Sequence, residues 1–332
     1  MNAPRSHVDG PREMTNEPSI ASQSQEHTLA TDPRDNSASA SIGERSTTIV
    51  RPLRSHMMLV VLGIAVSLGL AYDIANWEWP AGAAEGTTFP GSEPAVTPLP
   101  RRFRVTTFNI HGGFGEDGIL NLQRTADALR DADFVGMNEV RGPGWQDSRN
   151  QAEQLGKSLG LSWLFAPTET TWSGPHFGQG ILSRFPVTSW KRVPLDRRDG
   201  NGYRNYVECQ IPIETGDAQR QLTILVTHLD RKTDRQHQLK TVIRRFLEVP
   251  PPAILMGDLN SKRTEPQLIK LTSQSGVYDC FEPLFPSNLA RKRIDWLFIR
   301  GLKCLQSRLT STAASDHPTG WAELELSDHQ SN

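Results

Sequence analysis

The pattern of hydrophobic and polar positions changes character three times along the 332-residue chain. A polar opening stretch without any aromatic residue or periodicity gives way to an uncharged apolar run, then to a segment rich in Pro and Gly, and finally to a long region of periodic hydrophobicity. These changes predict a disordered tail over residues 1–56, a transmembrane signal anchor or signal peptide over 57–79, a linker over 80–101 and a folded domain over 102–328.

The apolar run covers residues 57–72, and Trp77 and Trp79 extend it with aromatics of the kind found at membrane interfaces. Arg45, Arg51 and Arg54 lie shortly before the run, whereas no Lys or Arg follows it before Arg101. The positive-inside rule therefore places the N-terminus in the cytoplasm and the folded domain on the extracytoplasmic side of a single-pass anchor.

Two other interpretations of the apolar run remain open. Gly69 and Ala71 are small residues of the kind that precede a signal-peptide cleavage point, which would make the domain a secreted protein, although the charged region before the run is unusually long for a signal peptide. The run could also be the buried helix of a soluble protein. The sequence favours the uncleaved anchor.

Within the expected domain, alternating or β-branched runs predict strands, and apolar residues three and four apart predict helices. Strands are predicted at residues 103–108, 133–140, 180–183, 186–193, 203–213, 221–227, 253–256, 293–299 and 319–326. Helices are predicted at residues 122–129, with a start near Asp117, and at 150–159, 233–247 and 264–271.

Polar residues end four of these predicted strands, one lies inside the strand at 293–299, and two precede the strand at 319–326. Asp258 and Asn260 follow the apolar run at 253–256, and two residues apart on an extended segment they point the same way. One such residue alone is typical of a turn, a cap or a satisfied core histidine. Together, at the strand ends where α/β sheets hold their sites, they predict a hard-cation and proton-transfer site. The set comprises Asn109, Glu139, His228, Asp258, Asn260, Asp295, Asp316 and His317.

The remaining composition excludes some chemistries and leaves others open. The set has too few His and Cys residues for zinc, and the chain shows neither a nucleophile elbow nor a Gly-rich phosphate loop. Residues 101–326 hold 30 Lys+Arg and 25 Asp+Glu, a mild excess that attracts anions. Three cysteines leave at least one unpaired, and the sequence does not choose a pair among Cys209, Cys280 and Cys304.

Seven segments resemble the motifs of the endonuclease/exonuclease/phosphatase superfamily, which has the DNase-I-like fold. They are TTFNIHGG at 106–113, VGMNEVRG at 135–142, GQGILSRFPV at 178–187, TILVTHLD at 223–230, AILMGDLNS at 253–261, RIDWLFI at 293–299 and SDHPT at 315–319, in the family's order. The resemblance implies an α/β fold, a four-layered sandwich in which two packed mixed β-sheets are flanked by helices. It also implies a phosphodiesterase or phosphatase that depends on Mg²⁺, with Mn²⁺ as a substitute.

The resemblance also implies roles for individual residues. Glu139 resembles the principal metal ligand of the family, with Asn109 and Asp316 near the same ion. Asp258 and Asn260 resemble the pair that orients the attacking water and the scissile phosphate.

The other candidates carry protons or contact substrate. His317 resembles the histidine that contacts the phosphate or takes a proton, Asp295 the carboxylate that holds it, and His228 a candidate acid toward the leaving oxygen. His111 stands where some nuclease members carry Asp, which leaves a second metal site open. The candidates for substrate contact are Arg141, His176, Arg204 and Asn205.

These expectations describe an exported, membrane-tethered, Mg²⁺-dependent phosphodiester hydrolase. Nucleic acid is favoured over a lipid headgroup as its substrate, and no protein partner is indicated. A sphingomyelinase-like or phosphoinositide-type lipid enzyme is the alternative, although no long apolar loop for lipid insertion is visible. A catalytically inactive binding module is disfavoured because Glu139, Asp258 and His317 are all present.

Overall fold

The structure is a computed structural model, and it describes residues 53–75, 77–89, 98–144, 147–172, 174–199, 202–213, 220–284 and 293–327. The predicted tail therefore lies, up to residue 52, outside the described residues. The same holds for residue 328, the expected end of the domain.

Helix α1 (Leu53–Ala75) contains the apolar run. Of the helices that the structure describes, it alone is long and apolar enough to cross a membrane, with a candidate span at His56–Ile74 and a mean hydropathy of 2.1. Trp79, expected inside the span, lies instead in strand β1 (Trp79–Pro80). Pro80 accounts for this difference, because a residue that precedes proline is disfavoured in a helix.

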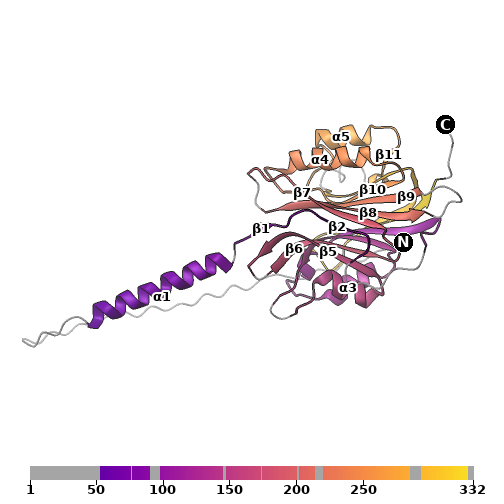
Figure 1. Ribbon diagram of the computed structural model, residues 1–332. Helices are drawn as coiled ribbons and strands as arrows, with labels where there is room; N and C mark the ends of the chain where they lie inside the picture. Colours follow the sequence, from indigo (N-terminus) through magenta and orange to yellow (C-terminus); the bar gives the residue numbers. More distant parts are fainter. Residues whose placement is uncertain are drawn as a thin grey trace, which may run out of the picture. The chain divides into compact units, whose positions relative to one another are not determined.

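The described part of the domain forms two mixed seven-stranded sheets that pack face to face (Figure 1). The order in the first sheet is β1, β5 (Ser162–Thr171), β6 (Gly174–Ser183), β4 (Phe134–Arg141), β3 (Arg102–Asn109), β14 (Thr319–Leu326) and β13 (Leu302–Thr310). The order in the second sheet is β11 (Val277–Asp279), β12 (Asp295–Arg300), β10 (Ala253–Asp258), β9 (Arg220–His228), β8 (Arg204–Ile213), β7 (Ser189–Leu195) and β2 (Ala84–Gly86).

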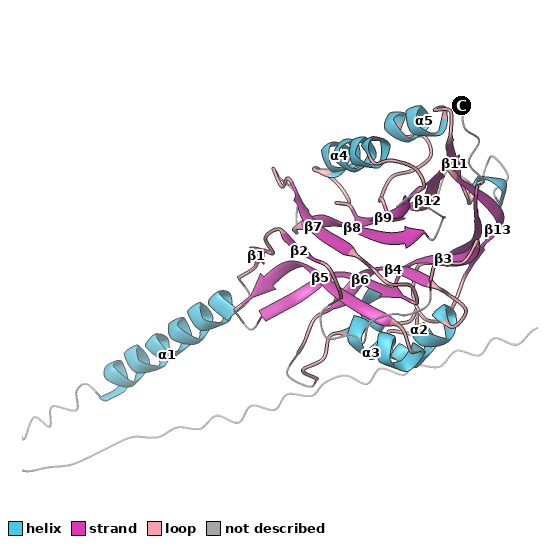
Figure 2. Cartoon of the chain, turned by 45° about the vertical axis from the view of Figure 1, so that its right-hand side comes forward, coloured by secondary structure: helices cyan, strands magenta, loops and turns pink. Residues whose placement is uncertain are grey.

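Helices cover the outer face of each sheet (Figure 2). Helices α2 (Leu122–Leu129) and α3 (Gln151–Leu159) lie on the first sheet, and α4 (Arg235–Glu248) and α5 (Pro266–Thr272) lie on the second. Short 3₁₀ turns occur at η1 (His111–Gly113) and η2 (Glu282–Leu284). Apolar side chains from both sheets fill the central layer, which confirms the predicted four-layered sandwich.

The segment expected as a linker is part of this sandwich. Strand β1 pairs with β5, and β2 pairs with β7. Phe89 and Leu99 are buried between the sheets, and the Trp190 indole donates a hydrogen bond to the Thr88 carbonyl over 2.8 Å. The linker prediction is therefore wrong for residues 80–89 and 98–101. Strands of two or three residues and isolated apolar anchors have no periodicity that a sequence pattern could show.

Two long strands were also missed. Strand β5 contains Pro167, a residue that is unfavourable inside a strand, and β13 is an edge strand in which exposed polar residues alternate with half-buried ones. Helix α2 begins after Asn121, not at Asp117. The Asn121 side chain accepts hydrogen bonds from the amides of Gln123 and Arg124, which is the usual N-cap arrangement.

Candidate active site

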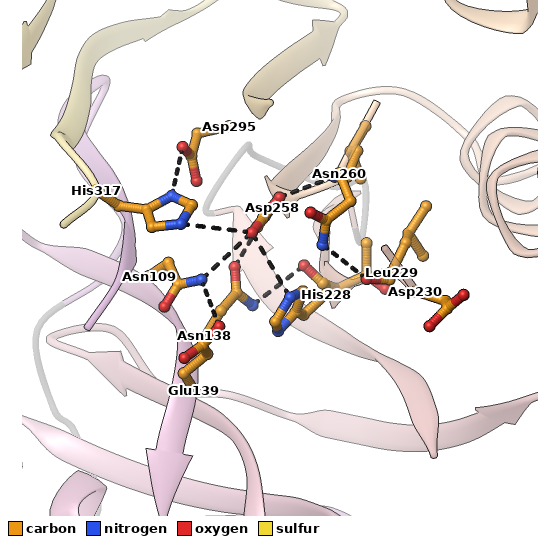
Figure 3. A network of polar contacts seen from close by, with 12 residues as sticks. Asn109, Asn138, Glu139, His228, Leu229, Asp230, Asp258, Asn260, Asp295 and His317 are labelled. Atoms are coloured by element: carbon orange, nitrogen blue, oxygen red, sulfur yellow. Dashed lines mark hydrogen bonds and ion pairs between the residues drawn. The ribbon is translucent and has the colours of Figure 1, made fainter. Parts of the chain in front are cut away.

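Most of the predicted catalytic and metal-binding residues come together where strands of the two sheets end. Figure 3 shows Asn109, Glu139, His228, Asp258, Asn260, Asp295 and His317. In the first sheet, β3 and β4 run parallel and bring Asn109 next to Asn138. In the second sheet, β9 and β10 run parallel and end side by side on His228 and Asp258, and Asp295 of antiparallel β12 lies opposite Asp258. The carboxyl ends of four strands therefore meet at one edge, as expected for a site in such a fold.

Local backbone distortions aim two of the side chains. The pairing of β4 with β6 is interrupted between Met137 and Val140, and Glu139 within this bulge has a φ of 58°. Asn260, just past β10, has a φ of 47°. Bulges and left-handed residues of this kind redirect side chains and cluster at functional sites.

Gly257 permits the close approach of β10 to β9. Its φ is 135°, and a Cβ atom at this position would lie 1.9 Å from the Thr227 carbonyl oxygen. Only glycine fits both the backbone conformation and the contact, so this residue places the following Asp258.

Asp258 is the centre of the site. Its Oδ2 accepts a hydrogen bond of 3.3 Å from the Asn109 amide and lies 3.5 Å from His228 Nε2 and 3.9 Å from His317 Nε2. Its Oδ1 accepts a bond of 2.8 Å from the backbone amide of Asn260. Burial, followed by the charge of Asp295, raises the pKa of Asp258 to about 7.

His317 is held by Asp295 through a hydrogen bond of 2.8 Å between Nδ1 and Oδ2. Burial opposes a charge on His317, but this bond and the charges of Asp295, Asp258 and Asp316 outweigh it and raise the pKa of His317 to about 9. His317 is therefore an imidazolium at neutral pH. The predicted association of the two residues is present in the structure.

His228 has the opposite electrostatic character. It is buried, and its Nε2 has no hydrogen-bond partner among the described residues. Burial, then the positive charges of Arg204, His317 and Arg231, holds the pKa of His228 well below its usual range. In the free protein His228 is thus neutral at pH 7 and lacks the proton that the expected acid role requires.

The expected metal ligands lie on one side of Asp258. The Asn109 amide donates to Glu139 Oε1 over 3.1 Å, and the Ser315 hydroxyl donates to the Asn109 carbonyl over 2.7 Å, which places Asp316 next to the same strand end. Glu139 is partly exposed and Asp316 half exposed, so waters can reach both carboxylates. Two carboxylates open to water suit a hydrated hard cation such as Mg²⁺. Asn109 is buried, and its Oδ1 accepts a bond of 3.1 Å from the His111 backbone amide.

A second group of potential ligands fits a metal less well. Ligand atoms of Asp258, Asp295 and His317 lie within 4.8 Å of one another. His317 and Asp295 are already joined by a hydrogen bond, and all three residues are buried. Water reaches the Glu139 and Asp316 carboxylates, so a hydrated cation fits them better than this buried group.

Comparison with known proteins agrees with this geometry. The sequence profile of the Endonuclease/Exonuclease/phosphatase family matches residues 106–329, about two thirds of the chain. The chain belongs to the endonuclease/exonuclease/phosphatase family. No curated protein sequence matches it.

Solved structures of this family share the fold. An endonuclease/exonuclease/phosphatase from Beutenbergia cavernae is 21% identical, with a TM-score of 0.53 over 68% of this chain and 72% of that one. A family protein from Bacteroides thetaiotaomicron is 18% identical, with a TM-score of 0.55 over 69% and 100%. D. rerio TDP2 with a single-stranded DNA product is 18% identical, with a TM-score of 0.51 over 68% and 99%.

In this family member, the residues expected to contact substrate fall into different environments. Arg141 is exposed just past the Glu139 bulge, with its guanidinium 5.5 Å from the Phe114 ring centre. The Arg204 side chain is largely buried, and its Nε has no hydrogen-bond partner among the described residues. Burial lowers the pKa of Arg204, while the charges of four surrounding carboxylates, Asp230, Glu139, Asp258 and Glu169, oppose that shift.

The other two residues differ from the expectation. Asn205 is buried, and its amide donates a bond of 2.8 Å to the Pro167 carbonyl, so its amide nitrogen joins the two sheets and does not face a substrate. His176 is exposed near the rim, with ligand atoms of Glu78 and Glu169 within 4.8 Å of its own. The nearest charged groups to His176 are therefore the carboxylates of Glu78 and Glu169, not a substrate-binding surface.

The sequence reasoning missed Asn138. Its side-chain carbonyl accepts a bond of 2.8 Å from the backbone amide of Asp258, and its amide donates to Gln179 Oε1 and to the Thr227 carbonyl. Asn138 thereby connects the first sheet to the strand end that carries Asp258. The sequence feature that could have revealed Asn138 is its carboxamide inside an apolar strand. A buried polar group of this kind requires hydrogen-bond partners.

Proposed function

We propose that this chain is a metal-dependent phosphodiester hydrolase that acts on nucleic acid. Members of its family are hydrolases of phosphoester bonds. The observation that carries the proposal is the arrangement around Asp258, whose carboxylate lies next to the charged His317 and to Asn109, which in turn bonds to Glu139. This arrangement places cationic, basic and metal-ligating groups around a single point, as phosphoester hydrolysis requires.

Each group has a separate task in the proposed reaction. A cation held by Asn109, Glu139 and Asp316 would neutralise charge on the phosphate. Asp258, whose pKa of about 7 suits a general base, would orient and deprotonate the attacking water together with Asn260. The charged His317, held by Asp295, would donate a hydrogen bond to a phosphate oxygen as negative charge develops.

The positive charge beside the site supports a polyanionic substrate. Arg141 is the exposed last residue of β4, and Arg204 lies among the carboxylates that surround the site. Arginine forks match phosphate oxygens, and extra backbone phosphates of a nucleic acid would use both side chains. The same fold in D. rerio TDP2 holds a single-stranded DNA product.

A lipid headgroup phosphodiester is the second candidate. It is supported by helix α1, which is apolar enough for a membrane anchor, and by Trp172, which is 70% exposed in the domain. We propose that α1 tethers the domain, with the N-terminus in the cytoplasm and the domain on the opposite side.

Hydrolysis of plasmid DNA, RNA, sphingomyelin, phosphoinositides and a bis-aryl phosphodiester, with Mg²⁺ and with chelator, tests the function and ranks the substrates. Chelation should abolish turnover, and Mg²⁺ or Mn²⁺ should restore it. Glu139→Gln should lower kcat/KM by about 10²–10³-fold, because the cation that neutralises the transition state is held less firmly. Glu116→Gln, which changes an exposed carboxylate, is the matched control. Full activity in excess chelator would refute the proposal.

Reporter fusions at the C-terminus test the tether. An enzyme that is active only outside the cytoplasm, such as a periplasmic phosphatase, should be active when it follows Asn332. A reporter that is active only in the cytoplasm would contradict the proposed orientation.

A further inference from the structure

Large exposed aromatics gather near one edge of the first sheet. The exposed fractions are 62% for Trp77, 44% for Trp79 and 70% for Trp172. Trp79 lies in β1 opposite Thr170 of β5, and Trp172 follows β5 in the turn to β6. Residues 77–80 and Trp172, here called the tryptophan edge, therefore lie close together although they are far apart in sequence.

The tryptophan edge cannot lie far from the end of the candidate membrane span. The span ends at Ile74, and Trp79 already pairs with β5. A fully extended chain from Ile74 to Trp79 reaches at most about 17 Å. Whatever the angle between helix and domain, β1 is held within that distance of the point where the span would leave the bilayer.

The edge also lies at the same end of the first sheet as the site residues. Phe177 of β6 pairs with Arg141, just past the Glu139 bulge, so the β5–β6 turn extends beyond the strand end that carries Glu139. The Arg204 guanidinium interacts with the charges of both Glu139 and Glu169, and Glu169 lies three residues before Trp172. The tryptophan edge and the catalytic carboxylates thus share one end of the sandwich.

We propose that the tryptophan edge docks onto the lipid surface of the bilayer, so that Trp77, Trp79 and Trp172 lie at the headgroup level and the site opens beside the membrane. Tryptophan suits this position because its ring is apolar and its N–H requires a polar partner. A zwitterionic surface is the fitting partner, since the same edge carries the carboxylates of Glu78 and Glu169. The inference rests on the proposed tether, and Trp172 is the informative residue because it belongs to the domain.

An environment-sensitive label separates docking from simple tethering. The full chain carrying Trp172→Cys and Cys304→Ser is labelled with a nitrobenzoxadiazole dye and reconstituted into phosphatidylcholine vesicles. The same dye at Ile269→Cys is the matched control, because Ile269 is also exposed, at 54%, but lies on α5 over the other sheet. Cys209 and Cys280 are buried and are not expected to react.

Docking predicts that the dye at position 172, but not at 269, shifts to shorter wavelength and is quenched by brominated acyl chains. Carbonate washing removes a chain that is not inserted in the bilayer. If the chain resists carbonate but the dye gives equal, unquenched spectra at both positions, the docking proposal is wrong and the tether proposal stands. If the dye at position 172 responds to vesicles but carbonate extracts the chain, the result supports docking and refutes the tether.

Activity provides a second readout. Trp172→Ala should lower hydrolysis of a phosphodiester presented on the vesicle surface by roughly three- to tenfold, because the site loses its alignment with the surface. Hydrolysis of a soluble bis-aryl phosphodiester should be unchanged. Loss of both activities would overturn the docking role, and absence of soluble activity in the unsubstituted chain would refute the proposed function without bearing on the label experiment.

Discussion

At the scale of single residues, the pair of His317 and Asp295 sets the charge of the site. Both side chains are buried, and the hydrogen bond between them is 2.8 Å long. An imidazolium in such a place is stable only because carboxylates surround it. The pair therefore links the protonation state of the site to the stability of the fold.

This linkage predicts a pH-dependent effect of Asp295→Asn. Because the pKa of His317 rises from 6.5 to about 9 on folding, the charged form contributes stability that is complete below pH 6.5 and lost as pH rises through about 9. Asp295→Asn should lower the free energy of unfolding by on the order of 2–3 kcal/mol below pH 6.5, with the difference shrinking toward pH 9.

Urea denaturation in the presence of chelator, at several pH values, measures this difference. Asp196→Asn is the matched control, because Asp196 pairs with His237 over 3.1 Å at an exposed site and should contribute less than about 1 kcal/mol. A difference for Asp295→Asn that is independent of pH would contradict the charged state of His317.

The neutral state of His228 leads to a second prediction. If His228 acts by supporting Asp258, His228→Ala should lower kcat/KM by a similar factor, about 10²-fold, for an ester with an alkoxide leaving group and for one with nitrophenolate. A general acid would matter far more for the alkoxide, which needs a proton to leave. Kinetics on a matched pair of esters, with His237→Ala as a surface control, decide the role. A much larger loss on the alkoxide ester would restore the acid role.

At the scale of elements, the edge strands of the two sheets approach each other where β11 and β13 lie. Cys280 directly follows β11, Cys304 is in β13, and their thiols are hydrogen-bonded to each other. The Ser307 hydroxyl of β13 also bonds to the Cys280 carbonyl. Cys280 and Cys304 are therefore the two cysteines that lie close together. Cys209 is buried on β8, in the half of the second sheet away from β11.

This proximity predicts that a mild thiol oxidant joins Cys280 to Cys304. Of the three cysteines, only one should then be alkylated after unfolding. The free energy of unfolding should rise by about 3 kcal/mol, because the bridge closes a loop in the unfolded chain. Peptide mapping identifies the pair, and Cys304→Ser is the control that should not respond. A bridge to Cys209 would contradict the arrangement of the edge strands.

At the scale of the whole molecule, the domain begins before the apparent linker ends. Strands β1 and β2 extend one edge of each sheet, and Phe89 and Leu99 fill the central core. A chain that starts at Arg101 should therefore unfold at a markedly lower temperature than one that starts at Trp77. Each lost core side chain costs about 2–5 kcal/mol. Thermal unfolding followed by circular dichroism compares the two chains, and equal midpoints would show that residues 77–100 are dispensable.

Much of the fold was predictable because its long strands and helices carry clear periodicity. Strand β10 and helix α4 lie within a few residues of their predicted positions. Strand β5 escaped because Pro167 opposes a local strand preference, and tertiary pairing with β6 overrides it. Asn138 escaped because its partners, Asp258 and Thr227, lie in the other sheet.

The sequence by itself determined which residues form the site and that most of them lie at strand ends, because the side chains of a strand and the residue that ends it are local properties. Tertiary structure decided everything that depends on distance between strands. Sheet order and register place Asp295 next to His317 and bury His228 beside Asp258. They also place the Asn205 amide where it donates a hydrogen bond to the Pro167 carbonyl of the other sheet. The charge states of the two histidines follow from burial and from neighbours far apart in the chain, and these exist only once the two sheets have packed.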